Sequence, residues 1–362
     1  MKYILFLIIS IFNTLNFNSQ ELRPGFDPDE YMNLLCISAR QSDTPWVAIT
    51  LPYPDGFNLV YRSPETGLFN MWDLWINPKG LAVISIRGTV NTTGSWLSNF
   101  HTGMIPAIGS IKIYEDDVFE YKLSNNSDAY VHAGWTIGLA SMADDITSKI
   151  DSIYNLGKKN ILIIGHSQGG AIAYLLRSYL YYKIEEGQLP NDIKIKTYCS
   201  AAPKPGNIFY AFDFEQITYG GWAFNIVNPL DWVPQSPFSI QTIDDFSDVN
   251  PYRNADKSIK SQKWPARIFI RRIFNKLRRP LNKSAKRFDK YLGNKAGTYV
   301  QSYLPNYEIP EFTGSQYYSR AGHQIVLEPD SVYFNDYAKR RHTFQHHSLR
   351  GYYYLAGKLK KK

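Results

Sequence analysis

The sequence has few residues that could crosslink the chain. Only two of its 362 residues are cysteines, Cys36 and Cys199. Two cysteines are no disulfide framework, and their spacing leaves open whether they pair. The sequence also has no internal repeat and no metal-ligand spacing, so we expect neither a repeat architecture nor a metal centre.

Apolar runs long enough to cross a bilayer are also missing. The run from Tyr3 to Phe12 is broken only by Ser10 and falls short of the ~20 residues that a span needs. It follows a basic start and precedes a polar stretch. This order predicts a signal peptide over 1–19, cleaved near Ser19, with an uncleaved anchor as the alternative. The chain is therefore expected to be secreted, or to reach the periplasm or cell envelope.

Acidic residues are scarce in one segment, 257–290. It holds 13 Lys and Arg and one acid, a net charge of +12, whereas the whole chain carries +8, so the remainder sums to −4. Apolar residues recur there at helical spacing, namely Ile270, Ile273, Phe274, Leu277 and Leu281. The pattern predicts an amphipathic helix that starts at Pro265 and stops at Pro280.

Two interpretations of this basic segment stay open. It can be a surface helix that docks on anionic lipid and inserts its apolar edge. It can instead be an insert that packs its apolar face on the core. The charge alone would also suit nucleic acid, but an exported chain argues against that partner.

The rest of the chain predicts an α/β protein. Hydrophobic residues make up 44% and charged residues 20%, enough for a large core. Short apolar runs alternate with helical stretches, which favours a mostly parallel central sheet with helices on both faces. The expected strands are 59–61, 71–76, 81–86, 160–164, 194–198, 224–227 and 325–327, and the expected helices include 28–42, 171–182 and 344–355.

A G-x-S-x-G pattern around Ser167 carries the chemistry. It follows the apolar run 161–164 and precedes the helical run 171–182, the setting of a nucleophile elbow. In such a tight turn the flanking Gly165 and Gly169 avoid a clash, and the serine hydroxyl stands above the sheet edge. The N–H of Gln168, at a helix start, would face a developing oxyanion.

A second loop fits the same chemistry. Arg87-Gly88-Thr89 follows the apolar run 81–86. A loop directly after a buried strand can supply the other oxyanion donor, and Thr89 offers both an amide and a hydroxyl. The structural alternative is an ordinary turn.

With these segments, the chain resembles the class 3, or fungal-type, lipases of the α/β-hydrolase superfamily. The resemblance runs in order from about residue 31 to residue 355. Its motifs are Arg87-Gly88-Thr89 with Trp96, Asn99 and Pro106, then Val131-His132-Ala133-Gly134-Trp135, Gly165-His166-Ser167-Gln168-Gly169-Gly170-Ala171, Ala201-Ala202-Pro203-Lys204-Pro205-Gly206-Asn207 and Asn228-Pro229-Leu230-Asp231-Trp232-Val233-Pro234.

The resemblance implies the remaining site residues. Asp231 would be the acid of a Ser-Asp-His triad, and His347 the base, with His346 as runner-up. Thr89 and Gln168 would form the oxyanion hole. The resemblance implies an acyl-enzyme mechanism that needs no metal or organic cofactor. It also implies an α/β-hydrolase fold, with 20–362 as one domain and a basic helical insert at about 255–295.

Three features depart from the family pattern or leave it open. Asp231 and His347 are 116 positions apart, farther than is usual in the family. Cys199-Ser200-Ala201 replaces the usual aromatic-glycine strand end. The family's lid would fall within 92–126, where Trp96, Phe100, Met104, Ile105 and Ile108 could form an apolar cover.

The resemblance leaves more than one function open. The leading expectation is a secreted triacylglycerol or acylglycerol lipase. The alternatives are a carboxylesterase or feruloyl-type esterase on smaller esters, a phospholipase, or a non-catalytic hydrolase-fold protein that binds membranes. The sequence leaves the oligomeric state open.

Overall fold

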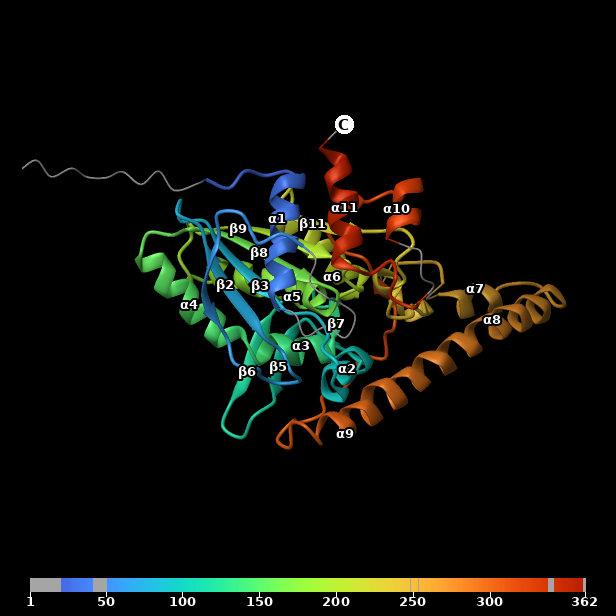
Figure 1. Ribbon diagram of the computed structural model, residues 1–362. Helices are drawn as coiled ribbons and strands as arrows, with labels where there is room; N and C mark the ends of the chain where they lie inside the picture. Colours follow the sequence, from blue (N-terminus) through green and yellow to red (C-terminus); the bar gives the residue numbers. More distant parts are fainter. Residues whose placement is uncertain (1–20, 42–50, 248, 253, 338–341, 361–362) are drawn as a thin grey trace, which may run out of the picture.

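A computed structural model describes residues 21–41, 51–247, 249–252, 254–337 and 342–360 (Figure 1). The expected signal peptide, 1–19, therefore lies outside the described residues. Within the described residues, several strands coincide with buried apolar runs, and capping residues mark the ends of several helices.

A seven-stranded sheet forms the centre, in the order β1-β2-β3-β8-β9-β11-β13. The first three strands pair antiparallel, and β3 onward pair parallel. All seven strands expected from the sequence are present. They are β1 (Asn58–Arg62), β2 (Trp72–Ile76), β3 (Ala82–Ile86), β8 (Asn160–His166), β9 (Lys194–Ser200), β11 (Ala223–Val227) and β13 (His323–Val326).

Helices cover both faces of this sheet. On one face pack α3 (Ala133–Ala140), α4 (Ala143–Asn155), α5 (Gln168–Glu185) and α6 (Ile208–Ile217). On the other pack α1 (Pro28–Ser38), which continues as a 3-10 turn to Gln41, and α11 (Leu349–Leu359). Alternate residues of β8 explain the two layers, since Ile161 and Ile163 join the first cluster and Leu162 and Ile164 the second. The fold is the α/β-hydrolase fold that the sequence predicted.

Smaller elements surround the sheet. A four-stranded sheet, in the order β12-β10-β7-β4, and the hairpin β5-β6 lie outside it. These strands are β4 (Met104–Pro106), β5 (Ile108–Lys112), β6 (Val118–Lys122), β7 (Tyr130–His132), β10 (Gly206–Asn207) and β12 (Tyr318–Ser319). The other α-helices are α2 (Thr93–Phe100), α7 (Ala255–Lys260), α8 (Ala266–Phe288), α9 (Ala296–Val300) and α10 (Ser331–Asp336). No helix in the described ranges is both long and apolar enough to cross a membrane.

The basic segment departs from its prediction at one end. Helix α8 begins after Pro265, as expected, but it runs through Pro280 to Phe288. A proline removes one helical hydrogen bond, and the turns beyond it are held because Ala285 is buried. Most of the apolar face does not pack on the core, since Ile270, Ile273, Leu277 and Leu281 stay exposed. The core-packing interpretation is therefore wrong for most of this helix, which runs diagonally along the body in Figure 1.

Three other expectations also need correction or completion. The last helix begins at Leu349, not 344, because Ser348 caps it by accepting the Gly351 N–H. Met104 and Ile105 belong to β4 and are buried, so they cannot form part of a movable cover. The two cysteines are free: Cys36 packs among the α1-side residues and Cys199 among those of the opposite face.

Candidate active site

The sheet brings the Ser167 turn and the Thr89 loop together. Strand β3 pairs with β8 in register, with Ile86 opposite Gly165, so the residues that follow both strands leave the same sheet edge. Ser167 sits between β8 and α5 with φ +62° and ψ −128°. A non-glycine residue at positive φ is strained, and such strain gathers at functional sites.

The glycines of this turn are explained by contact distances. A Cβ on Gly165 would lie 2.0 Å from the Gly169 carbonyl oxygen, and one on Gly169 would lie 2.2 Å from the Ile86 carbonyl oxygen. A Cβ on Gly88 would lie 2.9 Å from the His166 carbonyl oxygen. The strands and the helix can therefore approach this closely only through glycine.

Asp231 and His347 meet despite their separation in the sequence. Nδ1 of His347 lies 2.6 Å from Oδ2 of Asp231, and both residues are buried. The same oxygen accepts the Tyr352 hydroxyl at 2.9 Å, and Oδ1 accepts the Val233 N–H at 3.0 Å. Burial opposes ionisation of this carboxyl, but the His347 ring and the two other donors outweigh it, so the pKa of Asp231 is lowered.

The contact with Asp231 determines the free atom of His347. An ionised carboxylate only accepts, so Nδ1 carries the proton and Nε2 keeps its lone pair. Nε2 is buried and has no hydrogen-bond partner among the described residues. His347 and Ser167 line the same small cavity of about 30 Å³, together with Thr89 and His166.

His346 points elsewhere. Its Nδ1 lies 3.0 Å from the Tyr333 hydroxyl, and its Nε2 lies 2.6 Å from the Gln345 amide nitrogen. The backbone carbonyl of His346 lies 3.3 Å from the Asn228 amide nitrogen. The geometry therefore joins His347, rather than His346, to Asp231.

Asn99 links the two candidate oxyanion residues. Its amide nitrogen donates to Oγ1 of Thr89 at 2.9 Å, and its amide oxygen accepts from Nε2 of Gln168 at 3.1 Å. Thr89 and Gln168 are both buried. Because Oγ1 of Thr89 accepts from Asn99, its hydroxyl proton remains free to point at a substrate. The sequence motif includes Asn99, but its bridging position follows only from the structure.

His166 is a second residue whose position the sequence did not reveal. Its Nε2 lies 2.9 Å from the His347 carbonyl oxygen and its Nδ1 lies 3.0 Å from Oγ of Ser200. The Tyr31 hydroxyl lies 2.6 Å from the same Oγ. Burial, followed by the charge of His347, lowers the pKa of His166 to about 3. His166 is therefore neutral, with its proton on Nε2, because a carbonyl can only accept.

Other histidines serve the structure. The ring of His132 accepts the Trp135 N–H and caps α3. His323 is the first residue of β13. Among the described residues, no cluster of three or more His, Cys, Asp or Glu is placed to hold a metal ion.

Aromatic side chains gather beside His347. Phe344 has its ring centroid 6.0 Å from that of His347, 5.4 Å from that of Trp232 and 6.1 Å from that of Trp96. Trp96 stacks on Phe100, which is 54% exposed. The apolar residues Trp96 and Phe100 of α2 thus lie next to the candidate site, where the sequence predicted an apolar cover.

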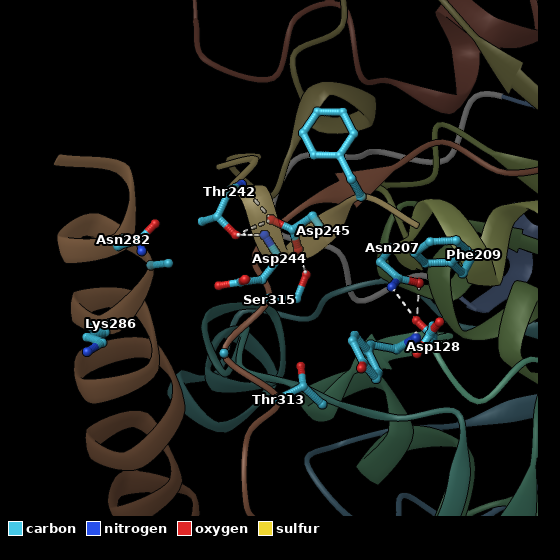
Figure 2. Close-up of a pocket in the computed structure, with 14 residues that line it drawn as sticks. Asp128, Asn207, Phe209, Thr242, Asp244, Asp245, Asn282, Lys286, Thr313 and Ser315 are labelled. Atoms are coloured by element: carbon cyan, nitrogen blue, oxygen red, sulfur yellow. Dashed lines mark hydrogen bonds between the residues drawn. The ribbon is translucent and has the colours of Figure 1, made fainter. Parts of the chain in front are cut away.

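A larger cavity lies away from these residues. It measures about 280 Å³ and is lined by polar residues of the 242–246 and 313–315 loops and by Asn282 and Lys286 of α8. Figure 2 shows these two side chains across a gap from Asp244 and Thr313. Neither Ser167, Asp231 nor His347 lines it, so we do not place the chemistry there.

Comparisons with known proteins agree with the motifs. The sequence pattern of the family described as Lipase (class 3) matches residues 83–241. A secreted mono- and diacylglycerol lipase of Malassezia globosa is 27% identical over 159 residues, 44% of this chain and 47% of that protein. The chain thus aligns with about half the length of this curated relative.

Solved structures of fungal lipases are also similar. Lipase II from Rhizopus niveus is 21% identical with a TM-score of 0.42, covering 58% of this chain and 74% of that one. The Rhizomucor miehei lipase propeptide complex is 18% identical with a TM-score of 0.41, covering 59% and 65%. The part of the chain that matches the class 3 lipase family, residues 83–241, holds both Ser167 and Asp231.

Proposed function

We propose that this protein is a serine ester hydrolase that acts on acylglycerols. The observation that carries the proposal is the His347–Asp231 contact. It leaves a buried Nε2, which has no partner in the described part of the chain, at the cavity that holds Ser167. The strained elbow and the family match support the same function. The small cavity at Ser167 also brings together the proposed base, His347, and the proposed oxyanion residue, Thr89.

The proposed mechanism follows from the positions of these atoms. Nε2 of His347 takes the Ser167 hydroxyl proton as Oγ attacks the ester carbonyl carbon. Asp231 holds the ring in this tautomer and stabilises the imidazolium that forms. The N–H groups of Thr89 and Gln168 stabilise the oxyanion. The alkoxide then leaves with the proton from His347, and a water deacylates Ser167 by the same route.

The substrate class rests on the apolar surroundings. Leu230 and Trp232, on either side of Asp231, are each 42% exposed. With Phe100 and Phe344 they provide apolar surface for an acyl chain. Because the cavity at Ser167 has a volume of only about 30 Å³, side chains must move before an acyl chain can enter. The relative's description as secreted supports export of this chain as well.

A covalent probe and two ester series test the proposal. We expect an alkyl phosphonate to label Ser167 and inactivate the protein, and Ser167→Ala to abolish both labelling and hydrolysis. Ser200→Ala is the matched control and should keep labelling at Ser167. Hydrolysis of long-chain acylglycerols above their solubility limit supports the lipase, whereas activity confined to soluble short esters makes the protein a carboxylesterase. Ester hydrolysis unchanged by Ser167→Ala would refute the mechanism.

A further inference from the structure

Helix α8 exposes both an apolar and a basic surface. Its apolar ridge, which we define as Ile270, Ile273, Leu277 and Leu281, follows one helical face, with exposed fractions of 39%, 44%, 67% and 43%. Nine Lys and Arg residues occupy the rest of the helix, which contains no acidic residue. Exposed apolar side chains in such a row mark an interaction site.

Contacts with the rest of the protein hold the helix at its middle and towards its C-terminal end. Ala285 is buried, Arg278 pairs with Asp256 of α7 at 3.5 Å, and the ring of Phe288 contacts that of Phe238 at 6.3 Å. By helical spacing Ala285 and Arg278 lie on a side of α8 next to the apolar ridge, whereas Phe288 continues the ridge face at the C-terminal end. The four residues of the apolar ridge themselves stay exposed. Towards its N-terminal end, Trp264 is 71% and Phe269 66% exposed.

The attachment places α8 on the same side as the candidate site. After α8 the chain makes a π-helical turn, Asp289–Lys295, and enters α9, which packs on α2. His101, directly after α2, lies 3.3 Å from the Leu292 carbonyl oxygen. Helix α2 carries Asn99, which bonds Thr89. Figure 1 shows α2, α9 and the end of α8 together.

We propose that α8 is a docking helix for anionic lipid bilayers. It would lie in the plane of the membrane surface, with its apolar ridge at the boundary of head groups and acyl chains and its basic side chains among the phosphates. A nucleic acid would use the charges but not the apolar ridge, so the bilayer is the partner that accounts for both surfaces.

This inference deepens the proposed function, because it names the surface on which the esterase would meet its substrate. Each exposed Lys or Arg near an anionic membrane contributes about 1 kcal/mol. The binding is therefore expected to need acidic lipid and to weaken as salt is added.

Vesicle flotation of the full chain carrying Ser167→Ala tests the proposal. We expect binding to vesicles of phosphatidylcholine with phosphatidylglycerol and none to phosphatidylcholine alone. Adding Ile273→Ser and Leu277→Ser, or Lys276→Glu and Lys283→Glu, should weaken binding at least about tenfold. The matched controls are Leu156→Ser, at a site 70% exposed, and Lys79→Glu, both far from α8 in the sequence.

The outcomes separate this inference from the hydrolase proposal. Hydrolysis of a soluble short ester by the protein with an intact Ser167 should be unchanged by Leu277→Ser. Equal binding to neutral and acidic vesicles, or vesicle binding insensitive to all α8 variants, would overturn the docking helix. So would duplex DNA binding as tight as vesicle binding and insensitive to Leu277→Ser. A dimer that Leu277→Ser dissociates, without any vesicle binding, would assign the ridge to a second copy of the chain.

Discussion

The ring of His166 bonds the backbone carbonyl oxygen of His347 across 2.9 Å. It thereby fixes the loop of the proposed base to the residue directly before the proposed nucleophile. The ring centroids of the two histidines lie 4.8 Å apart. His166 is thus a positioning residue, which acts on the reaction only through where it holds His347.

Replacing His166 should therefore slow the reaction rather than weaken substrate binding. We expect His166→Leu to lower kcat about tenfold with little change in KM, because a misplaced base fails in the transition state. His166→Gln should recover part of kcat, since its amide can still donate to the carbonyl. Tyr31→Phe is the control. Tyr31 reaches His166 only through the hydroxyl of Ser200, so this variant should have a smaller effect. Steady-state kinetics of the three variants decide, and a rise in KM alone would argue against positioning.

His166 also predicts a loss of stability in acid. Its pKa is lowered to about 3 in the folded chain, whereas an unfolded His titrates near ~6.5. Between these values only the unfolded chain binds the proton, so the free energy of unfolding falls as the pH falls through this window. From pH 7 to 5 the contribution is about 2 kcal/mol. Urea unfolding at the two pH values should show a smaller drop in His166→Gln, and the full drop in the exposed His323→Gln.

The two adjacent histidines give a sharp test of the base. We expect His347→Ala to lower kcat by at least about a thousandfold, because Nε2 is lost and Asp231 is left without its partner. His346→Ala should lower it by less than about tenfold, since His346 contacts Tyr333. The measurement is kcat on one soluble ester. The opposite order of effects would move the base to His346.

Tyr352 supports the carboxylate from the last helix. Its hydroxyl donates to Oδ2 of Asp231 and accepts the Asn228 N–H at 3.0 Å. Tyr352→Phe leaves that buried N–H unpaired, which should cost about 1–3 kcal/mol of unfolding free energy. We also expect kcat to fall several-fold, because Asp231 loses one donor. Tyr353→Phe, on the next residue, should leave both quantities near their original values, and an equal effect of both variants would contradict the assignment.

The elbow glycine makes a prediction about folding. Gly165→Ala puts a Cβ 2.0 Å from the Gly169 carbonyl oxygen, so β8 and α5 must separate. We expect a loss of about 3 kcal/mol or more in unfolding free energy. The control is Gly157→Ala, where the φ of +77° is strained but nothing lies within 4 Å, and about 1 kcal/mol is expected. Calorimetry of both variants compares the two costs.

The sequence predicted what short-range patterns determine. The apolar runs before Gly165 and Arg87 predicted two strands, β8 and β3. Because the two strands pair in parallel, the turns that follow them lie at the same edge of the sheet. The runs at 194–198 and 224–227 likewise predicted strands, and the structure has β9 and β11 there. The family motifs then added Asp231 and His347, whose contact the structure contains.

Long-range contacts escaped the sequence for a physical reason. Nothing local in His166 or Tyr352 indicates that their polar atoms reach His347 and Asp231, because these bonds join segments more than 120 positions apart. The end of α8 was misjudged since the cost of Pro280 is local, whereas the burial of Ala285 that offsets it is tertiary. Helix spacing alone likewise could not tell an apolar face packed on the core from one left exposed.

The last helix has a consequence for how the protein matures. Helix α11 packs on α1, so the two ends of the described chain lie against each other, and His347 directly precedes α11. During synthesis the segments that carry Ser167 and Asp231 are therefore made before the segment that carries His347. The proposed base would take its place when α11 packs on α1, so the docking of these two helices would complete the proposed site.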